Sequence, residues 1–179
     1  MVGHLTRRVA FACALASAQP VAARAADIGM IGDDRDSVQA GLGAFAAVKH
    51  RDIPDRAAEA RIEYRFGRKL WRIGPLVGLM ANGNGGLFAY GALYLDAHLG
   101  AWAITPAAGG GFYSKGEGKD LGGEGEFMWS FDVAYMLAGG SRLGVKLAHI
   151  SNGNTQDRNP GTESLLLTYT MPTEWFSRR

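Results

Sequence analysis

The chain has 179 residues, a formal net charge of +2 and one cysteine, Cys13. This length suits a single domain, and the small net charge gives no support for nucleic-acid binding. Glycine is frequent at 26 residues, about twice its average usage, but follows no collagen-like period.

The first 25 residues have the pattern of an export signal. Two arginines precede a short apolar run over residues 9–18, and Ala23-Arg24-Ala25 fits an A-x-A cleavage site. The run is too short for a membrane-spanning helix, which needs about 20 residues. We therefore predict a signal peptide over 1–25 and a mature domain over 26–179. Because Cys13 lies in the signal, the mature chain has no thiol for a disulfide or a nucleophile.

The mature part alternates between apolar and polar residues with a period of two, which is typical of β-strands. The alternation is clearest over 58–66, 87–99 and 127–137, where one face is apolar and the other carries charged or small polar residues. In a soluble β-sandwich the apolar face would pack inward. In an outer-membrane barrel it would face lipid, with the polar face toward the lumen.

Two features favour the membrane barrel. The expected strands are long, at about ten residues, as a tilted membrane strand requires. The polar face of 58–66 also carries charges of both signs, which could pair across a narrow lumen: Glu59, Arg61, Glu63 and Arg65.

We therefore predict an all-β fold, namely an eight-stranded antiparallel transmembrane β-barrel in the outer membrane. The expected strands are 37–48, 57–66, 70–80, 86–99, 101–113, 124–137, 142–151 and 162–171. An even number suits a bacterial barrel, and eight strands enclose an interior filled by side chains. Short connections at 67–69, 100 and 139–141 alternate with longer ones at 49–56, 81–85, 114–123 and 152–161. We place the longer ones outside the cell.

Three polar residues interrupt the apolar face of the last two expected strands. His149 and Ser151 share the parity of Val145 and Leu147, and Glu163 shares the parity of Leu165. Polar groups in hydrocarbon cost several kcal/mol unless they are satisfied. Because these two strands meet at the external rim, we expect the three residues to cluster near the outer leaflet and to face lipid.

These residue types are the ones that acyl transfer requires. A serine such as Ser151 supplies the nucleophile, His149 takes and returns its proton, and Glu163 fixes the imidazole tautomer. Asn152, helped by backbone N–H groups around Gly153, could donate to a tetrahedral oxyanion. The alternative is that these polar residues are incidental, because the rim of a barrel is polar and loops begin there.

The motif His149-Ile150-Ser151-Asn152, followed by Asn159-Pro160-Gly161-Thr162-Glu163-Ser164, resembles the signature of the lipid A 3-O-deacylase (PagL-type) family. In that family the glutamate follows the histidine by fourteen residues, as Glu163 follows His149. The resemblance implies an eight-stranded outer-membrane barrel with the triad on its outer surface. It also implies hydrolysis of the ester that links a 3-hydroxyacyl chain to position 3 of lipid A, without a metal or other cofactor. The motif covers the last two strands, and the rest of the chain agrees in architecture and length.

The expected partners are lipid A or lipopolysaccharide as substrate and the surrounding outer-membrane lipid, with a homodimer as a further expectation. Basic loop residues could hold the lipid A phosphates: Lys49, Arg51, Arg56, Lys115, Lys119 and Arg158. Two other functions stay open at this point. One is a non-catalytic structural or adhesion barrel, and the other is a phospholipid esterase.

Overall fold

The computed structural model describes residues 27–32, 34–48 and 55–177. The predicted signal peptide, Lys49 and Arg51 lie outside the described residues. No helix within the described ranges has the length and apolar character needed to cross a membrane.

The described chain is almost entirely β-structure. Its strands are β1 (Ile28–Met30), β2 (Ser37–Phe45), β3 (Ala57–Arg65), β4 (Ile73–Asn82), β5 (Leu87–Leu95), β6 (Ala97–Leu99), β7 (Trp102–Ser114), β8 (Gly125–Met136), β9 (Arg142–Ser151) and β10 (Thr162–Pro172). A 3₁₀ turn spans Ala138–Gly140, and a short helix, α1, spans Glu174–Ser177.

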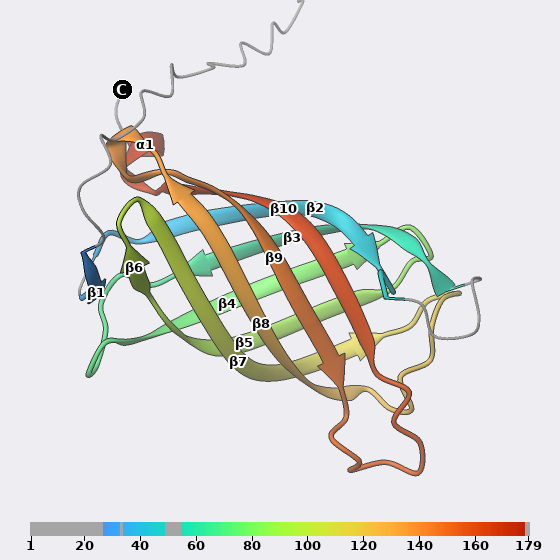
Figure 1. The fold of residues 1–179 in the computed structure, drawn as a ribbon. Helices are drawn as coiled ribbons and strands as arrows, with labels where there is room; N and C mark the ends of the chain where they lie inside the picture. Colours follow the sequence, from blue (N-terminus) through green and yellow to red (C-terminus); the bar gives the residue numbers. More distant parts are fainter. Residues whose placement is uncertain (1–26, 33, 49–54, 178–179) are drawn as a thin grey trace, which may run out of the picture.

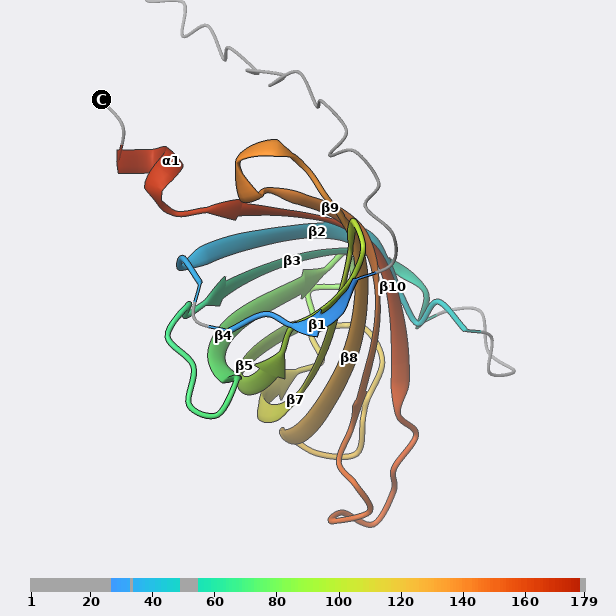
Figure 2. The same cartoon turned by 60° about the vertical axis from the view of Figure 1, so that its left-hand side comes forward.

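Eight of these strands close into an antiparallel barrel (Figures 1 and 2). Going around the wall, the order is β2, β3, β4, β5, β7, β8, β9 and β10, and β10 pairs back with β2. The predicted eight-stranded barrel is therefore confirmed. Figure 1 shows β1 and α1 at one end and the loop 152–161 at the other.

The strand expected over 86–99 is divided in two at Asp96. The carboxylate of Asp96 binds Arg142 at 3.0 Å and Lys69 at 3.3 Å inside the barrel, and it accepts a hydrogen bond from Thr105. β6 continues the pairing with β7 beyond this break, and β1 adds to the free edge of β6. β1 was not predicted, because three residues are too few to show an alternation.

Burial in the barrel is inverted relative to a soluble protein. The charged residues that alternate along β3 are buried, whereas Ile62 between them is 52% exposed. Many other exposed side chains of the wall are apolar, among them Leu42, Val77, Leu93, Phe127, Trp129, Val145 and Leu167. This apolar outer surface is the one that an outer-membrane barrel presents to lipid.

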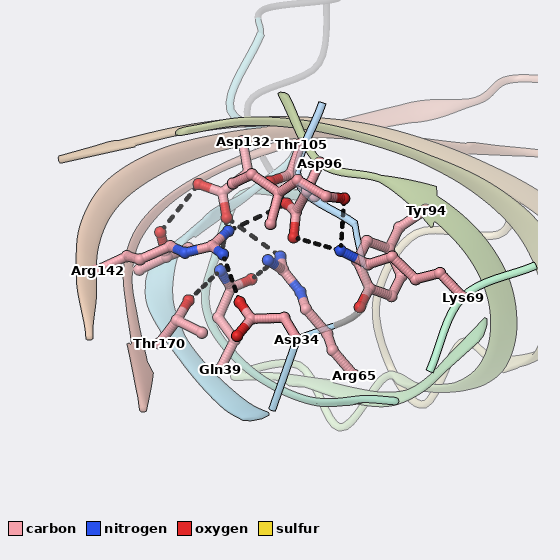
Figure 3. Close-up of polar contacts among 12 residues, drawn as sticks. Asp34, Gln39, Arg65, Lys69, Tyr94, Asp96, Thr105, Asp132, Arg142 and Thr170 are labelled. Carbon is pink, nitrogen blue, oxygen red and sulfur yellow. Dashed lines mark hydrogen bonds and ion pairs between the residues drawn. The ribbon is translucent and has the colours of Figure 1, made fainter. Parts of the chain in front are cut away.

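A polar network fills much of the lumen (Figure 3). Arg65 contacts Glu63 on its own strand and Asp132 on β8, each at 3.2 Å. Asp132 also accepts a hydrogen bond from Gln39 on β2. The charges of β3 therefore pair both along the strand and across the lumen, as the sequence predicted.

Nearer the long loops, the interior also contains a cluster of apolar side chains. Its buried side chains come from strand ends and include Phe45, Met80, Phe88, Tyr113, Met128 and Ile150. Leu121 belongs to the same cluster, and it comes from the loop between β7 and β8. This loop therefore folds back over the barrel and is anchored in it.

The connections do not alternate in length as strictly as predicted. The β4–β5 connection, expected among the longer ones, is a tight turn over 83–86. It is tight because the Asn82 side chain accepts hydrogen bonds from the N–H groups of Asn84 and Gly86. The β3–β4 connection, expected to be short, spans 66–72.

Candidate active site

The three polar residues predicted to face lipid lie side by side on adjacent strands. Ser151 is the last residue of β9 and His149 is two residues before it. Glu163 is the second residue of β10. The β9–β10 register sets Glu163 directly opposite His149. All three are partly buried on the outward face, between inward-facing residues that are fully buried.

His149 and Glu163 are joined by a hydrogen bond. Nδ1 of His149 lies 3.1 Å from Oε1 of Glu163, and the two side chains are 24% and 21% exposed. When Nδ1–H donates this bond, the lone pair of the neutral ring is on Nε2. Within the described part of the chain, Nε2 has no hydrogen-bond partner. It is therefore free to accept a proton.

Gly161 leaves room for the imidazole. A Cβ at this position would lie 3.1 Å from Cε1 of His149 and 3.5 Å from Nε2. Gly161 also has a φ of +53°, which L side chains rarely adopt. A larger residue here would strain the backbone and press on the imidazole ring.

Ser151 lies on the same outward face as His149, two residues further along β9. This spacing is about 6.6 Å along a strand. In the described part of the chain the Ser151 hydroxyl makes no hydrogen bond, so it is not committed to a structural role.

Two aromatic rings on β8 flank the pair on β9. Trp129 is opposite His149 in the β8–β9 register, and Phe127 is opposite Ser151. The Trp129 and His149 rings stack with centroids 5.6 Å apart and an interplanar angle of 23°. His149 therefore has an aromatic face on one side and a carboxylate on the other.

Asn152 differs from its neighbours, because its side chain points inward and is fully buried. Its Nδ2 donates to the carbonyl oxygens of Leu121 at 2.9 Å and Arg158 at 2.7 Å. Both amide protons are used, so the side chain has none left for an oxyanion. The backbone N–H of Gly153 has no acceptor within the described residues.

The predicted basic residues are distributed over the loops. Lys115 and Arg158 both contact Asp120, at 3.2 and 3.5 Å. The hydrogen bond from the N–H of Gly122 lowers the pKa of the Asp120 carboxyl below its ordinary value, and the hydrogen bond from Lys115 adds to this effect. Arg56 donates to the carbonyl oxygen of Ala47. Among the described residues, no three His, Cys, Asp or Glu side chains group as metal ligands.

A family model described as lipid A 3-O-deacylase (PagL) matches residues 56–172. The chain belongs to this family. The matched range runs from the start of β3 to the end of β10 and so contains the three predicted triad residues. The PagL family consists of ester hydrolases of the outer membrane, in agreement with the barrel and its apolar outer surface.

Two solved structures were matched, and the first supports the fold. The chain is similar to one titled crystal structure of the outer membrane enzyme PagL, with 20% identity and a TM-score of 0.55, over 76% of this chain and 99% of that chain. It also matches the Yersinia pestis outer membrane protein Ail in a phospholipid bilayer nanodisc, with 10% identity and a TM-score of 0.46, over 77% of this chain and 100% of that one. No curated protein matches the chain. At 20% identity the likeness to the PagL structure concerns the fold.

Sequence reasoning about this PagL-family chain missed Trp129 and Gly161. Trp129 carried no signal beyond its place on an apolar face, and its contact with His149 depends on the β8–β9 register. Gly161 stands in the quoted motif, but its contact with the imidazole needs the fold of the loop.

Proposed function

We propose that this chain is a serine esterase that removes the 3-hydroxyacyl chain ester-linked to position 3 of lipid A. The observation that carries the proposal is the hydrogen-bonded pair of His149 and Glu163 on the lipid-facing surface, with Ser151 next to it on β9. A buried pair inside the lumen could not meet a lipid, whereas this pair is partly exposed on the outward face of the wall.

In the first half of the reaction, Ser151 Oγ attacks the carbonyl carbon of the ester while Nε2 of His149 takes the hydroxyl proton. The oxyanion that forms accepts a hydrogen bond from the N–H of Gly153. When the tetrahedral intermediate collapses, the C–O bond to the sugar breaks and His149 returns the proton to the sugar oxygen. Deacylated lipid A leaves, and the acyl chain stays on Ser151.

In the second half, a water molecule attacks the acyl-enzyme and gives its proton to His149. Collapse releases the 3-hydroxy fatty acid and restores the Ser151 hydroxyl with that proton. Throughout, the carboxylate of Glu163 holds Nδ1–H and offsets the charge of the imidazolium. The substrate reaches Ser151 sideways from the outer leaflet, because the lumen is filled by side chains.

The test is mass spectrometry of lipid A from cells that express the wild type or Ser151→Ala. We expect the wild type to remove one 3-hydroxyacyl group and the variant to remove none. The matched control is Ser114→Ala, which changes an exposed serine at the same rim, at the end of β7. This control should keep wild-type activity.

Retained activity in Ser151→Ala would exclude this serine as the nucleophile. Release of unsubstituted fatty acid from glycerophospholipid, with lipid A unchanged, would support the phospholipid esterase instead. If neither lipid changes while the barrel is folded, the non-catalytic alternative is favoured. Protein sequencing of the mature N-terminus tests the proposed removal of residues 1–25.

A further inference from the structure

The side chain of Asn152, the residue after the proposed nucleophile, makes three hydrogen bonds. Asn152 is 0% exposed, and its side chain points into the barrel while that of Ser151 points out. Besides the two bonds from Nδ2, its Oδ1 accepts the N–H of Asn154 at 3.0 Å. Its backbone N–H donates to Oδ1 of Asn159 at 3.2 Å. The backbone N–H and both polar atoms of the Asn152 side chain are therefore hydrogen-bonded.

The bond from Asn154 shapes the chain just after the nucleophile. The carbonyl oxygen of Asn152 also accepts hydrogen bonds from the N–H and the hydroxyl of Thr155, at 3.1 and 2.7 Å. These bonds close a tight turn in which Gly153 and Asn154 both have left-handed backbones, with φ of +62° and +64°. The turn leaves the N–H of Gly153 without an acceptor and fixes its direction.

The bonds from Nδ2 connect two loops that are far apart in sequence. One acceptor, Leu121, belongs to the loop between β7 and β8, and the other, Arg158, belongs to the loop between β9 and β10. The side chain of Leu121 is only 1% exposed, within the apolar cluster of the lumen. Through Asn152, the turn that carries Gly153 is thus attached to the packed interior of the barrel.

We infer that Asn152 is a positioning residue that aims the Gly153 N–H at the reacting carbonyl by fixing the turn and tying it to the loop 115–124. The inference rests on the proposed function, since it assumes that an ester carbonyl is attacked by Ser151. It replaces the expectation that the Asn152 side chain itself donates to the oxyanion. A preorganised donor of this kind acts on the transition state more than on substrate binding.

The first experiment compares Asn152→Ala and Asn152→Ser with the wild type, using purified, folded barrels and lipid A in mixed micelles. Alanine removes both the turn bond and the loop bonds. Serine keeps an acceptor for the N–H of Asn154 but is too short to reach Leu121. We expect kcat to fall about 10²-fold for alanine and about tenfold for serine, with KM unchanged. Ser151 is also labelled by a fluorophosphonate, in a reaction that forms the Ser Oγ–P bond and expels fluoride. Its five-coordinate transition state places negative charge on the phosphoryl oxygen, so this labelling should slow in the same order.

The second experiment disturbs the same connection without touching Asn152. A Cβ on Gly122 would lie 2.1 Å from the Arg158 carbonyl oxygen and 2.9 Å from Nδ2 of Asn152, at a φ of +96°. Gly122→Ala must therefore push the two loops apart, and we expect it to lower kcat as Asn152→Ala does. Gly116→Ala is the matched control. It strains the same loop at a φ of +55°, but against the β4–β5 turn at Gly85 rather than against Arg158 or Asn152. It should keep the wild-type kcat.

The results separate this inference from the proposed function. Wild-type kcat in Asn152→Ala would overturn the inference, and so would a raised KM with unchanged kcat and unchanged labelling. A wild type that leaves lipid A intact would refute the proposed substrate instead. In that case the labelling rates of the same variants still decide the role of Asn152. The shift in electrophoretic mobility on heating reports that each barrel is folded.

Discussion

Two nitrogen-bearing side chains of β9 each pair with a carboxylate, one inside the barrel and one on its outer face. The two pairs differ in burial and in the number of their further partners. Inside the barrel, Lys146 of β9 binds Glu63 at 2.5 Å, and both side chains are 1% exposed. Outside, His149 of the same strand binds Glu163 at 3.1 Å, and both are more than a fifth exposed. Lys146 and His149 point to opposite faces of β9 because successive side chains of a strand alternate between its two faces.

The carboxylate of the inner pair has further partners. Glu63 also accepts a hydrogen bond from Tyr90 at 2.8 Å and contacts Arg65 at 3.2 Å. In the outer pair, the ring nitrogen of His149 that does not face Glu163 has no described partner, and neither has the hydroxyl of Ser151. The carboxylate of the inner pair is therefore fully used in structural contacts, whereas the outer pair leaves a ring nitrogen open, as the proposed mechanism requires.

The largest effect in this comparison should come from Glu163→Gln. The amide keeps the size of the carboxylate but cannot fix the Nδ1–H tautomer or offset the imidazolium, so kcat should fall about 10³- to 10⁴-fold. Initial rates of 3-hydroxy fatty acid release measure this loss. Glu124→Gln, an exposed carboxylate of the loop before β8, is the control and should behave as the wild type. Equal rates for both variants would remove Glu163 from the mechanism.

Much of this contrast was visible in the sequence, because the strand period is short and local. Alternation alone assigned Glu63 to the lumen and His149 to the outer face, and the structure confirms both. The same alternation sets Asn152 on the face opposite Ser151, which is evidence against a direct contact of its side chain with the oxyanion. The expectation of such a contact was based on the residue type alone. The contacts of His149 with Trp129 depended on inter-strand register, which the turn over 137–141 sets and which no local pattern encodes.

A second prediction concerns stability and should leave the chemistry alone. Glu63→Ala leaves Lys146 and Arg65 as buried cations that share fewer carboxylates, and we expect a loss of about 3–5 kcal/mol in the free energy of unfolding. Urea titration of the barrel in lipid vesicles measures this loss.

Lys146→Met is the comparison variant. It should lower the free energy of unfolding by less, because Glu63 then keeps Arg65 and Tyr90 as partners. The folded fraction of either variant should retain wild-type kcat. An unchanged unfolding midpoint in Glu63→Ala would show that the inner pair is not structural.

The smallest effect is expected when Trp129, the aromatic neighbour of the outer pair, is replaced. This change tests whether the ring helps to orient His149. Trp129→Leu keeps an apolar side chain toward lipid but removes the ring that stacks on His149. An aromatic contact of this kind contributes about 0.5–1.5 kcal/mol, so we expect kcat/KM to fall about two- to tenfold. Phe131→Leu makes the same kind of change one step along β8, opposite Leu147 rather than His149. If both variants lose the same activity, the loss reflects general packing against lipid. A loss confined to Trp129→Leu assigns the ring to the orientation of the imidazole.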